Sequence, residues 1–235
     1  MSQYPAPEPH GPIEEVFADV FFVQGSIRIA PGMRINRGMV ILRHGTELTL
    51  VNPVRLDAAG QSDLERLGQV KRAVRLGHQH GRDDPYVVAE LGASYWTLEQ
   101  ETLGPTVRRQ TMSATRPPCP DTRLFEFQDT VAPEGALLVE SHRLLITCDA
   151  VQHWEGTDRC SLLARLTMPL LGFRQGTLIG PPWRRDNTQK GGPTLEADFR
   201  RLLELDFDHL VGAHGRPRIG GAKEALRAHV DRIYS

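Results

Sequence analysis

A helix-like run that leads into a short apolar strand and a histidine beside a glycine occurs twice in this chain. The first copy covers residues 62–72 and then 73–77, and it reaches His78. The second copy begins with the run 196–205 and reaches His214. Strands that alternate with helices favour an α/β fold with sheets inside and helices outside. We therefore expect a sandwich of two similar halves, with functional groups gathered where loops leave the strand ends.

The first histidine belongs to a pair, His78 and His80, which a single residue separates. On an extended strand end, side chains two residues apart point the same way, so both imidazoles can reach one point. The carboxylates of Asp83 and Asp84 follow within four residues. Because imidazole and carboxylate groups are common metal ligands, this spacing suits a metal ion.

A further candidate ligand, Asp149, ends the apolar run 143–148, which is typical of a strand buried on both faces. A carboxylate in that position is costly unless it is paired, hydrogen-bonded or bound to a metal. The complete candidate ligand set, which suits zinc, iron or manganese at a site with an open position, is His78, His80, Asp149 and His214. The same four residues could instead hydrogen-bond to one another and hold loops together.

Composition excludes several classes of protein. The chain has 235 residues, of which 40% are hydrophobic and 24% charged, as in ordinary soluble domains. Its formal net charge of −1 gives no global electrostatic case for binding nucleic acid or a membrane. The three cysteines include no C-x-x-C pair, so a disulfide framework is not expected. We expect a cytoplasmic protein, since the start has no basic segment before an apolar core and no apolar run approaches a membrane span.

An irregular, proline-rich arm over residues 1–12 precedes the first expected strand. Strands are expected over 15–24, 38–43, 47–51, 73–77, 93–97, 124–127, 136–140 and 143–148. The segments 38–43 and 47–51 form a predicted hairpin. The linker 115–121 divides a single domain into halves of about 13–114 and 122–235.

Helix boundaries follow from local signals. Ser62 and Glu65 form a capping box, which predicts a helix start at residue 62. An aspartate before a proline predicts a helix over 85–91. Two further helices, over 194–205 and 221–233, bracket the strand that leads to the last histidine.

The segment 172–193 is rich in Gly, Pro and Arg and is predicted to be a long loop. Loops of that length in a domain are usually functional or disordered. Arg184, Arg185 and Lys190 could contact an anionic substrate there, or they could simply be solvated.

The order His-x-His-x-x-Asp over 78–83, then an apolar strand that ends at Asp149, then Val-Gly-Ala-His-Gly around His214, resembles the metallo-β-lactamase superfamily. The resemblance covers roughly residues 16–232. It implies an α/β fold, a four-layer αββα sandwich with one or two metal ions at its edge. Members of that superfamily are mostly hydrolases, with some oxidoreductases and nucleases.

By this resemblance, His78 and His80 match the first histidine pair of the family. Asp149 matches the aspartate that bridges the two metal ions, and His214 matches the last histidine.

The chain also departs from the family pattern. Arg82 stands where the family has an aspartate, and Asp83 stands where it has a histidine. Cys148 replaces the glycine before the bridging aspartate. The middle histidine of the family is missing from the segment 130–139, where Glu134 is the nearest potential ligand.

These departures favour one metal ion, or none, over two. If Arg82 pointed inward at about 5 Å, it would repel each unit of metal charge by about 3 kcal/mol at an effective dielectric near 20. It could equally turn outward and pair with Asp84.

We therefore expect a hydrolase that uses one divalent ion, zinc before iron or manganese, to activate water for attack on an unknown small molecule. Asp83 or Asp149 would accept the proton, and His153 is a further candidate beside the tryptophan that follows it. The alternative is an inactive family member that binds a small molecule or protein partner through the vestigial site.

Overall fold

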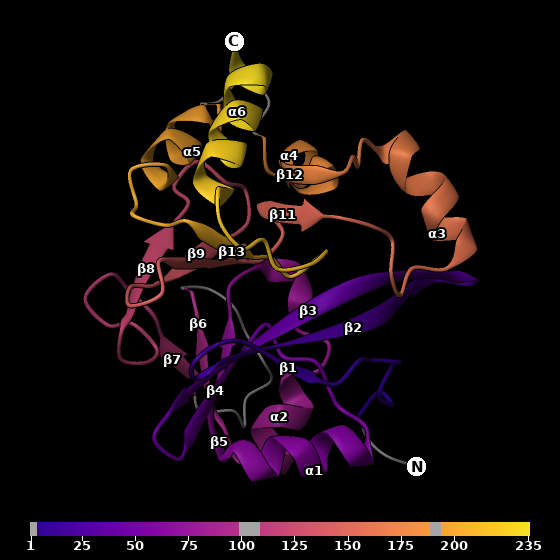
Figure 1. Cartoon of the computed structure of the whole chain (residues 1–235), viewed down its shortest axis with the longest axis vertical. Coiled ribbons are helices and arrows are strands. Elements are labelled where there is room, and N and C mark those ends of the chain that lie inside the picture. Colours follow the sequence, from indigo (N-terminus) through magenta and orange to yellow (C-terminus); the bar gives the residue numbers. More distant parts are fainter. Residues whose placement is uncertain (1–3, 99–108, 189–193) are drawn as a thin grey trace.

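Alternate residues of the buried strands face two different apolar cores, which places each sheet between two layers. In β10 (Leu144–Thr147), Leu144 and Ile146 pack between the two sheets, whereas Leu145 packs outward against helices. The pleat of a strand imposes this period of two. Each such side chain contributes about 1.5–3 kcal/mol by its burial. Figure 1 shows the computed structural model, which describes residues 4–98, 109–188 and 194–235.

The first sheet has seven strands in chain order. They are β1 (Ile13–Phe17), β2 (Val20–Ala30), β3 (Met33–His44), β4 (Glu47–Val51), β5 (Gln69–Arg75), β6 (Ser94–Thr97) and β7 (Arg109–Thr111). Strands β1 to β4 are antiparallel, and β4 to β7 are parallel. The predicted hairpin is confirmed, whereas the single strand expected over 15–24 is two strands with a turn at Asp19, whose φ is 63°.

The second half of the chain forms a smaller sheet and a separate two-stranded ribbon. The sheet has the order β13-β10-β9-β8, with β8 (Thr122–Glu126), β9 (Gly135–Val139) and β13 (His209–Val211) around β10. The ribbon pairs β11 (Val151–Trp154) with β12 (Gly176–Ile179). Strands β10 and β13 run parallel, so their carboxyl ends meet at one edge.

Helices cover the outer face of each sheet (Figure 1). The described helices are α1 (Ala58–Leu67), α2 (Asp84–Glu90), α3 (Leu162–Thr167), α4 (Pro181–Asn187), α5 (Glu196–Leu202) and α6 (Ala222–Tyr234), with 3₁₀ turns η1 (His78–His80) and η2 (Met168–Leu171). Of these, α3 packs against β3 at the tip of the β2–β3 ribbon instead of on a sheet face. Leu64 of α1 and Val87 of α2 pack on the first sheet, and Phe199 of α5 and Leu226 of α6 pack on the second. The four-layer αββα sandwich is therefore confirmed. Within the described ranges, no helix combines the length and apolar composition needed to cross a membrane.

The predicted helix start at residue 62 is wrong. Helix α1 begins at Ala58, because the Asp57 carboxylate accepts a hydrogen bond from the Gly60 N–H at 2.9 Å. Ser62 lies inside the helix, and its hydroxyl donates to the Ala58 carbonyl. The helix ends at Leu67, so β5 begins earlier than the strand predicted over 73–77.

The loop predicted over 172–193 is also wrong in most of its described part. Strand β12 and helix α4 occupy it, and α4 begins with two prolines, which suit the first turn of a helix. Leu178, Ile179 and Trp183 are buried, which explains why this Gly-rich and Pro-rich segment is ordered against the rest of the fold.

Asp84 begins α2 with its carboxylate turned toward the sheet instead of capping the helix. It is fully buried, and it accepts a hydrogen bond from the Tyr95 hydroxyl at 3.1 Å. Its nearest cation is Arg75, whose Nε lies 3.9 Å away. Burial outweighs these partners and raises the pKa of Asp84 to about 6.

Asp84→Asn is expected to stabilise the protein at neutral pH. The folded state favours the protonated carboxyl of Asp84. Ionising it at neutral pH therefore lowers the free energy of unfolding, by about 3 kcal/mol for a pKa shift of about two units. In the wild type, the contribution of Asp84 to stability is thus present below about pH 4 and is lost as the pH rises through 6. In the variant, the asparagine amide does not titrate, so this loss is absent. Urea unfolding at acid and neutral pH measures this, and an identical pH dependence in both proteins would contradict it.

Candidate metal centre

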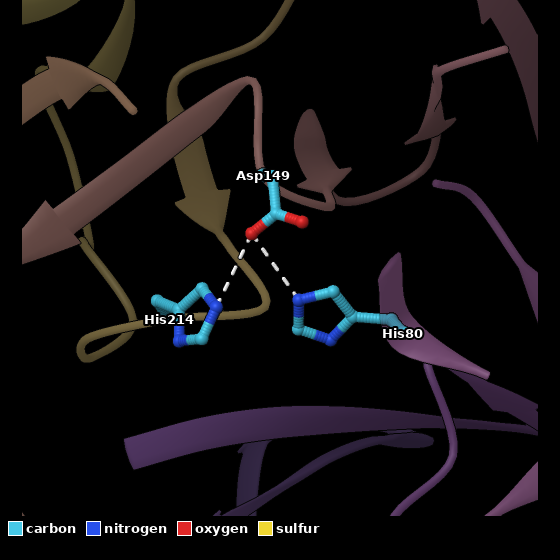
Figure 2. Close-up of side chains that lie close together, drawn as sticks. All are labelled: His80, Asp149 and His214. Carbon is cyan, nitrogen blue, oxygen red and sulfur yellow. Dashed lines mark hydrogen bonds and ion pairs between the residues drawn. The ribbon is translucent and has the colours of Figure 1, made fainter. Parts of the chain in front are cut away.

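Three buried side chains converge where the two sheets meet at one edge. The Nε2 atoms of His80 and His214 each lie 3.2 Å from the same oxygen, Oδ1 of Asp149 (Figure 2). One ligand atom from each of the three residues lies within 4.8 Å of the others. Asp149 follows β10 and His214 follows its parallel neighbour β13, while His80 ends η1 after β5 of the other sheet. The predicted residues His80, Asp149 and His214 are thus brought together.

Glycines beside the two histidine segments have a steric cause. Gly215 has a φ of 87°, and a Cβ on it would lie 1.8 Å from the His153 carbonyl oxygen. A Cβ on Gly77 would lie 2.2 Å from Oε2 of Glu134 and 2.8 Å from Sγ of Cys148. Both turns therefore require glycine, because the chain passes against other residues at contact distance.

The ring of His214 is oriented as a metal-binding histidine would be. Its Nδ1 lies 2.6 Å from the backbone carbonyl oxygen of Asn36, and a carbonyl can only accept, so Nδ1 carries a proton. A neutral ring then turns the lone pair of Nε2 toward the carboxylate of Asp149. Two lone pairs at 3.2 Å repel each other unless a proton or a cation lies between them. A backbone carbonyl that fixes the second ring nitrogen is the usual outer partner of a metal-bound histidine.

The charge states of the other two residues also fit a cation. Burial lowers the pKa of His80, although Asp149 opposes this shift, so the imidazole is neutral. Burial alone would raise the pKa of Asp149, but positive charge at His80 and His214 and hydrogen bonds from their rings outweigh it and hold that pKa well below its usual range. With both rings neutral, a bound cation would supply that positive charge. Neutral imidazole and ionised carboxylate are the forms that bind divalent ions. Three such ligands with a fourth position open form the ligand set of a catalytic zinc site.

His78 lies outside this group. The expectation that both histidines reach one point assumed a strand end, but β5 ends at Arg75 and His78 begins the 3₁₀ turn η1. With three residues per turn, side chains two residues apart point in different directions. His78 is exposed, whereas His80 is buried. The geometric argument for His78 is therefore wrong.

Glu134 positions Asp149 and lies outside the group of three. Its buried carboxyl accepts hydrogen bonds from the backbone N–H groups of Asp149 and Ala150, both at 2.9 Å. Burial and the nearby Asp149 raise the pKa of Glu134 well above its usual range, which favours its protonated form. A neutral carboxyl group is a poor ligand, but it fixes the loop that carries Asp149.

Arg82 turns away from the centre and pairs with Asp83 instead of the expected Asp84. Its guanidinium donates to Oδ1 of Asp83 at 2.7 Å and to the Ala6 carbonyl oxygen at 3.0 Å. The other oxygen of Asp83 accepts from the Arg55 N–H at 3.0 Å. Both carboxylate oxygens of Asp83 thus already accept hydrogen bonds. These bonds oppose a role for Asp83 in accepting a proton from water.

Arg37 is the site residue that the sequence reasoning missed. Its side chain is almost fully buried, and it donates to Asp83 at 3.1 Å and to the Pro53 carbonyl oxygen at 2.6 Å. Burial lowers the pKa of Arg37, while Asp83 opposes this shift. The guanidinium lies close enough to His80 to help lower its pKa as well. An arginine in a strand is usually on the surface, but two consecutive aspartates beside the histidines were a signal that a buried cation was needed.

The remaining candidates lie elsewhere or are not described. His153 is buried, and its ring contacts Thr177 at 3.0 Å and Glu155 at 3.2 Å. Arg185 is exposed and pairs with Asp186. Arg184 lies near His229 of α6. Burial is the main cause that lowers the pKa of His229, and the charges of Arg232 and Arg184 add to it. Lys190 lies outside the described residues.

A cavity of about 140 Å³ opens over Asp149 and His214. Trp154 forms one wall, with its ring 6.2 Å from that of His214 and only 10° from parallel to it. The other apolar walls are Ile29, Met33, Ile35, Met168, Leu171, Phe173, Pro182 and Trp183. Gln79 and Gln152 complete the lining, and no lysine or arginine of the described residues belongs to it. The cavity is therefore apolar with a polar floor.

No protein-family model and no curated protein sequence matches this chain. Its structure resembles DIM-1 metallo-β-lactamase exposed to ceftazidime, with a TM-score of 0.62 and 9% identity over 97% of this chain and 100% of that one. A metallo-β-lactamase from Erythrobacter litoralis gives a TM-score of 0.61 and 9% identity, over 94% of this chain and 92% of that one. FIM-1 from Pseudomonas aeruginosa, in its mono-zinc form, gives a TM-score of 0.59 and 9% identity, over 97% of this chain and 98% of that one. The chain therefore has the metallo-β-lactamase fold.

Proposed function

We propose that this protein is a hydrolase that uses one divalent metal ion, zinc in the first place, held by His80, Asp149 and His214. The observation that carries the proposal is the Nε2 atom of His214, which Asn36 orients toward Asp149 at a distance that requires a proton or a cation between them, together with His80 on the same oxygen. The fold shared with metal-dependent hydrolases supports it, and one of those structures is a mono-zinc form.

A single ion agrees with the charges around the centre. Arg37 and Arg82 already neutralise Asp83, and burial favours the neutral form of Glu134, so Asp149 is the one carboxylate in the described ligand group. A second divalent ion would meet the buried guanidinium of Arg37 without a free carboxylate to offset the repulsion.

The residues of the chain divide the catalytic work. When bound, the ion would lower the pKa of a coordinated water and polarise a carbonyl or phosphoryl oxygen. Asp149 faces both imidazoles through Oδ1, and among the described residues its Oδ2 accepts no hydrogen bond, which leaves that oxygen to orient a water molecule by accepting a hydrogen bond from it. Glu134 holds the backbone of Asp149 in place. Gln79 at the cavity wall offers an amide to a substrate oxygen.

The cavity favours a neutral substrate with an apolar group. Its walls are mostly aliphatic and aromatic, and its described lining offers no lysine or arginine to an anion. We therefore propose carboxylic esters, lactones or thioesters as the substrate class, ahead of phosphodiesters. The cytoplasmic location and the alternative role as an inactive binding protein stay predictions.

Hydrolysis of ester, lactone, thioester and phosphodiester probes by the zinc-loaded protein tests the proposal. We expect turnover of apolar carbonyl probes that His80→Ala lowers by about 100-fold or more and that His78→Ala leaves unchanged. If no probe is hydrolysed although zinc is bound at the centre, the protein is an inactive binding member and the proposed activity is wrong.

A further inference from the structure

Exposed apolar side chains gather around the mouth of the cavity. Eight large hydrophobic side chains are exposed in the described part of the chain, and six of them belong to the β2–β3 ribbon tip or to the α3–η2 segment. We call these six the apolar rim: Ile29, Leu162, Leu163, Leu166, Leu170 and Leu171. Ile29 and Leu171 also line the cavity over the metal centre, so the rim and the cavity are continuous. A cluster of this kind marks an interaction site more often than scattered exposed residues do.

The local fold turns these leucines outward. Ser161 caps α3 by accepting a hydrogen bond from the Ala164 N–H, and the Arg34 N–H of the ribbon donates to the same hydroxyl at 3.1 Å. Ala164 and Met168 pack inward with Trp154. The helix is thus held by one narrow face, while Leu162, Leu166 and Leu170 lie 73%, 65% and 86% exposed. Figure 1 shows α3 at the outer edge of the molecule, above the tip of the β2–β3 ribbon.

Three arginines flank the apolar rim. Arg165 and Arg174 lie on or directly after the α3–η2 segment, and Arg28 precedes Ile29. All three are exposed, and none forms an ion pair within the ranges that the structure describes. The sequence from 159 to 185 contains five arginines and no acidic residue, with Asp158 directly before it and Asp186, the partner of Arg185, directly after it. The rim therefore combines aliphatic side chains with a local positive charge, although the net charge of the whole chain is close to zero.

We propose that the apolar rim binds the surface of an anionic lipid bilayer. Leucines that enter the acyl boundary beside arginines that contact anionic headgroups are the pattern of an interfacial amphipathic segment. A second copy of the chain fits less well, because a symmetric contact would bring the arginines of both copies together. The substrate alone does not explain the rim, since Leu162 and Leu166 do not line the cavity.

Bound in this way, the cavity would open toward the lipid. Neutral apolar compounds concentrate there, which agrees with the apolar walls over Asp149 and His214. The surface binding itself needs neither a metal ion nor catalysis. Failure of the proposed hydrolysis would therefore leave this inference standing, and the reverse also holds.

Co-sedimentation with vesicles tests the proposal on the full chain. Vesicles of phosphatidylcholine with about one third phosphatidylglycerol are expected to bind the protein at least about tenfold more tightly than phosphatidylcholine alone, and high salt weakens the binding. The double variant Leu162→Ser/Leu166→Ser and the variant Arg165→Glu each lower the affinity by about tenfold. These positions are exposed, so the fold is retained.

Val131 and Ile219 provide the matched control, because they are equally exposed but lie outside the rim. Val131→Ser and Ile219→Ser are expected to leave vesicle binding unchanged. The proposal is overturned if the protein ignores anionic vesicles, if the control variants lose binding equally, or if the rim variants instead abolish a dimer seen by light scattering, which would assign the rim to a second copy.

Discussion

His80→Ala is expected to weaken zinc binding by about 100-fold or more, whereas His78→Ala leaves it within about threefold. The two histidines are two residues apart, yet only His80 is buried against Asp149, with 3.2 Å between its Nε2 and the carboxylate oxygen. Removing one of three protein ligands leaves an imidazole and a carboxylate, which hold a divalent ion weakly. Competition with a chromophoric chelator measures both affinities in the same assay.

The pair is informative because the two variants remove the same chemical group. His78→Ala serves as the matched control for general effects of losing a histidine in this turn. An equal loss of affinity in both variants would contradict the assignment, and so would unchanged affinity in His80→Ala.

Arg37→Met is expected to lower the free energy of unfolding by about 3–5 kcal/mol. The substitution keeps much of the side-chain volume but leaves Asp83 buried without its closest buried cation, although Arg82 and the Arg55 N–H remain. Removing one partner of a buried ion pair strands the other charge, which is costlier than removing both. Denaturant unfolding at neutral pH gives the value.

The double variant Arg37→Met/Asp83→Asn is the control for this prediction. It removes both charges, so we expect it to recover about half of the lost stability, and the double-mutant cycle then gives the coupling between the two groups. A loss below about 1 kcal/mol for Arg37→Met alone would contradict a structural role for the pair.

The strands and the positions of their ends could be predicted from the sequence, because the patterns that indicate them lie within a few residues. The run 144–148 before Asp149 is apolar except for Thr147, and the structure buries both of its faces. The costly carboxylate at its end led directly to the position that now faces His80 and His214. The four-layer arrangement followed from the order of these signals and from the family resemblance.

The parts that failed depend on contacts between distant residues. Arg37 and Asp83 are 46 residues apart, and the residues next to Arg37 in the sequence do not predict that its side chain is buried. The role of Glu134 depends on the backbone of Asp149, which comes from another strand. The strand-end geometry assumed for His78 differs for a local reason, since the chain leaves β5 before the histidines and turns in a 3₁₀ conformation.

Zinc-edge anomalous diffraction from crystals grown with zinc would locate any bound ion. We expect one anomalous peak per chain, within about 2.0–2.2 Å of the Nε2 atoms of His80 and His214 and of a carboxylate oxygen of Asp149. We expect no second peak beside Asp83, whose oxygens are held by Arg37 and Arg82. A peak that involves His78, two peaks at the centre, or no peak between the three ligands would contradict this expectation.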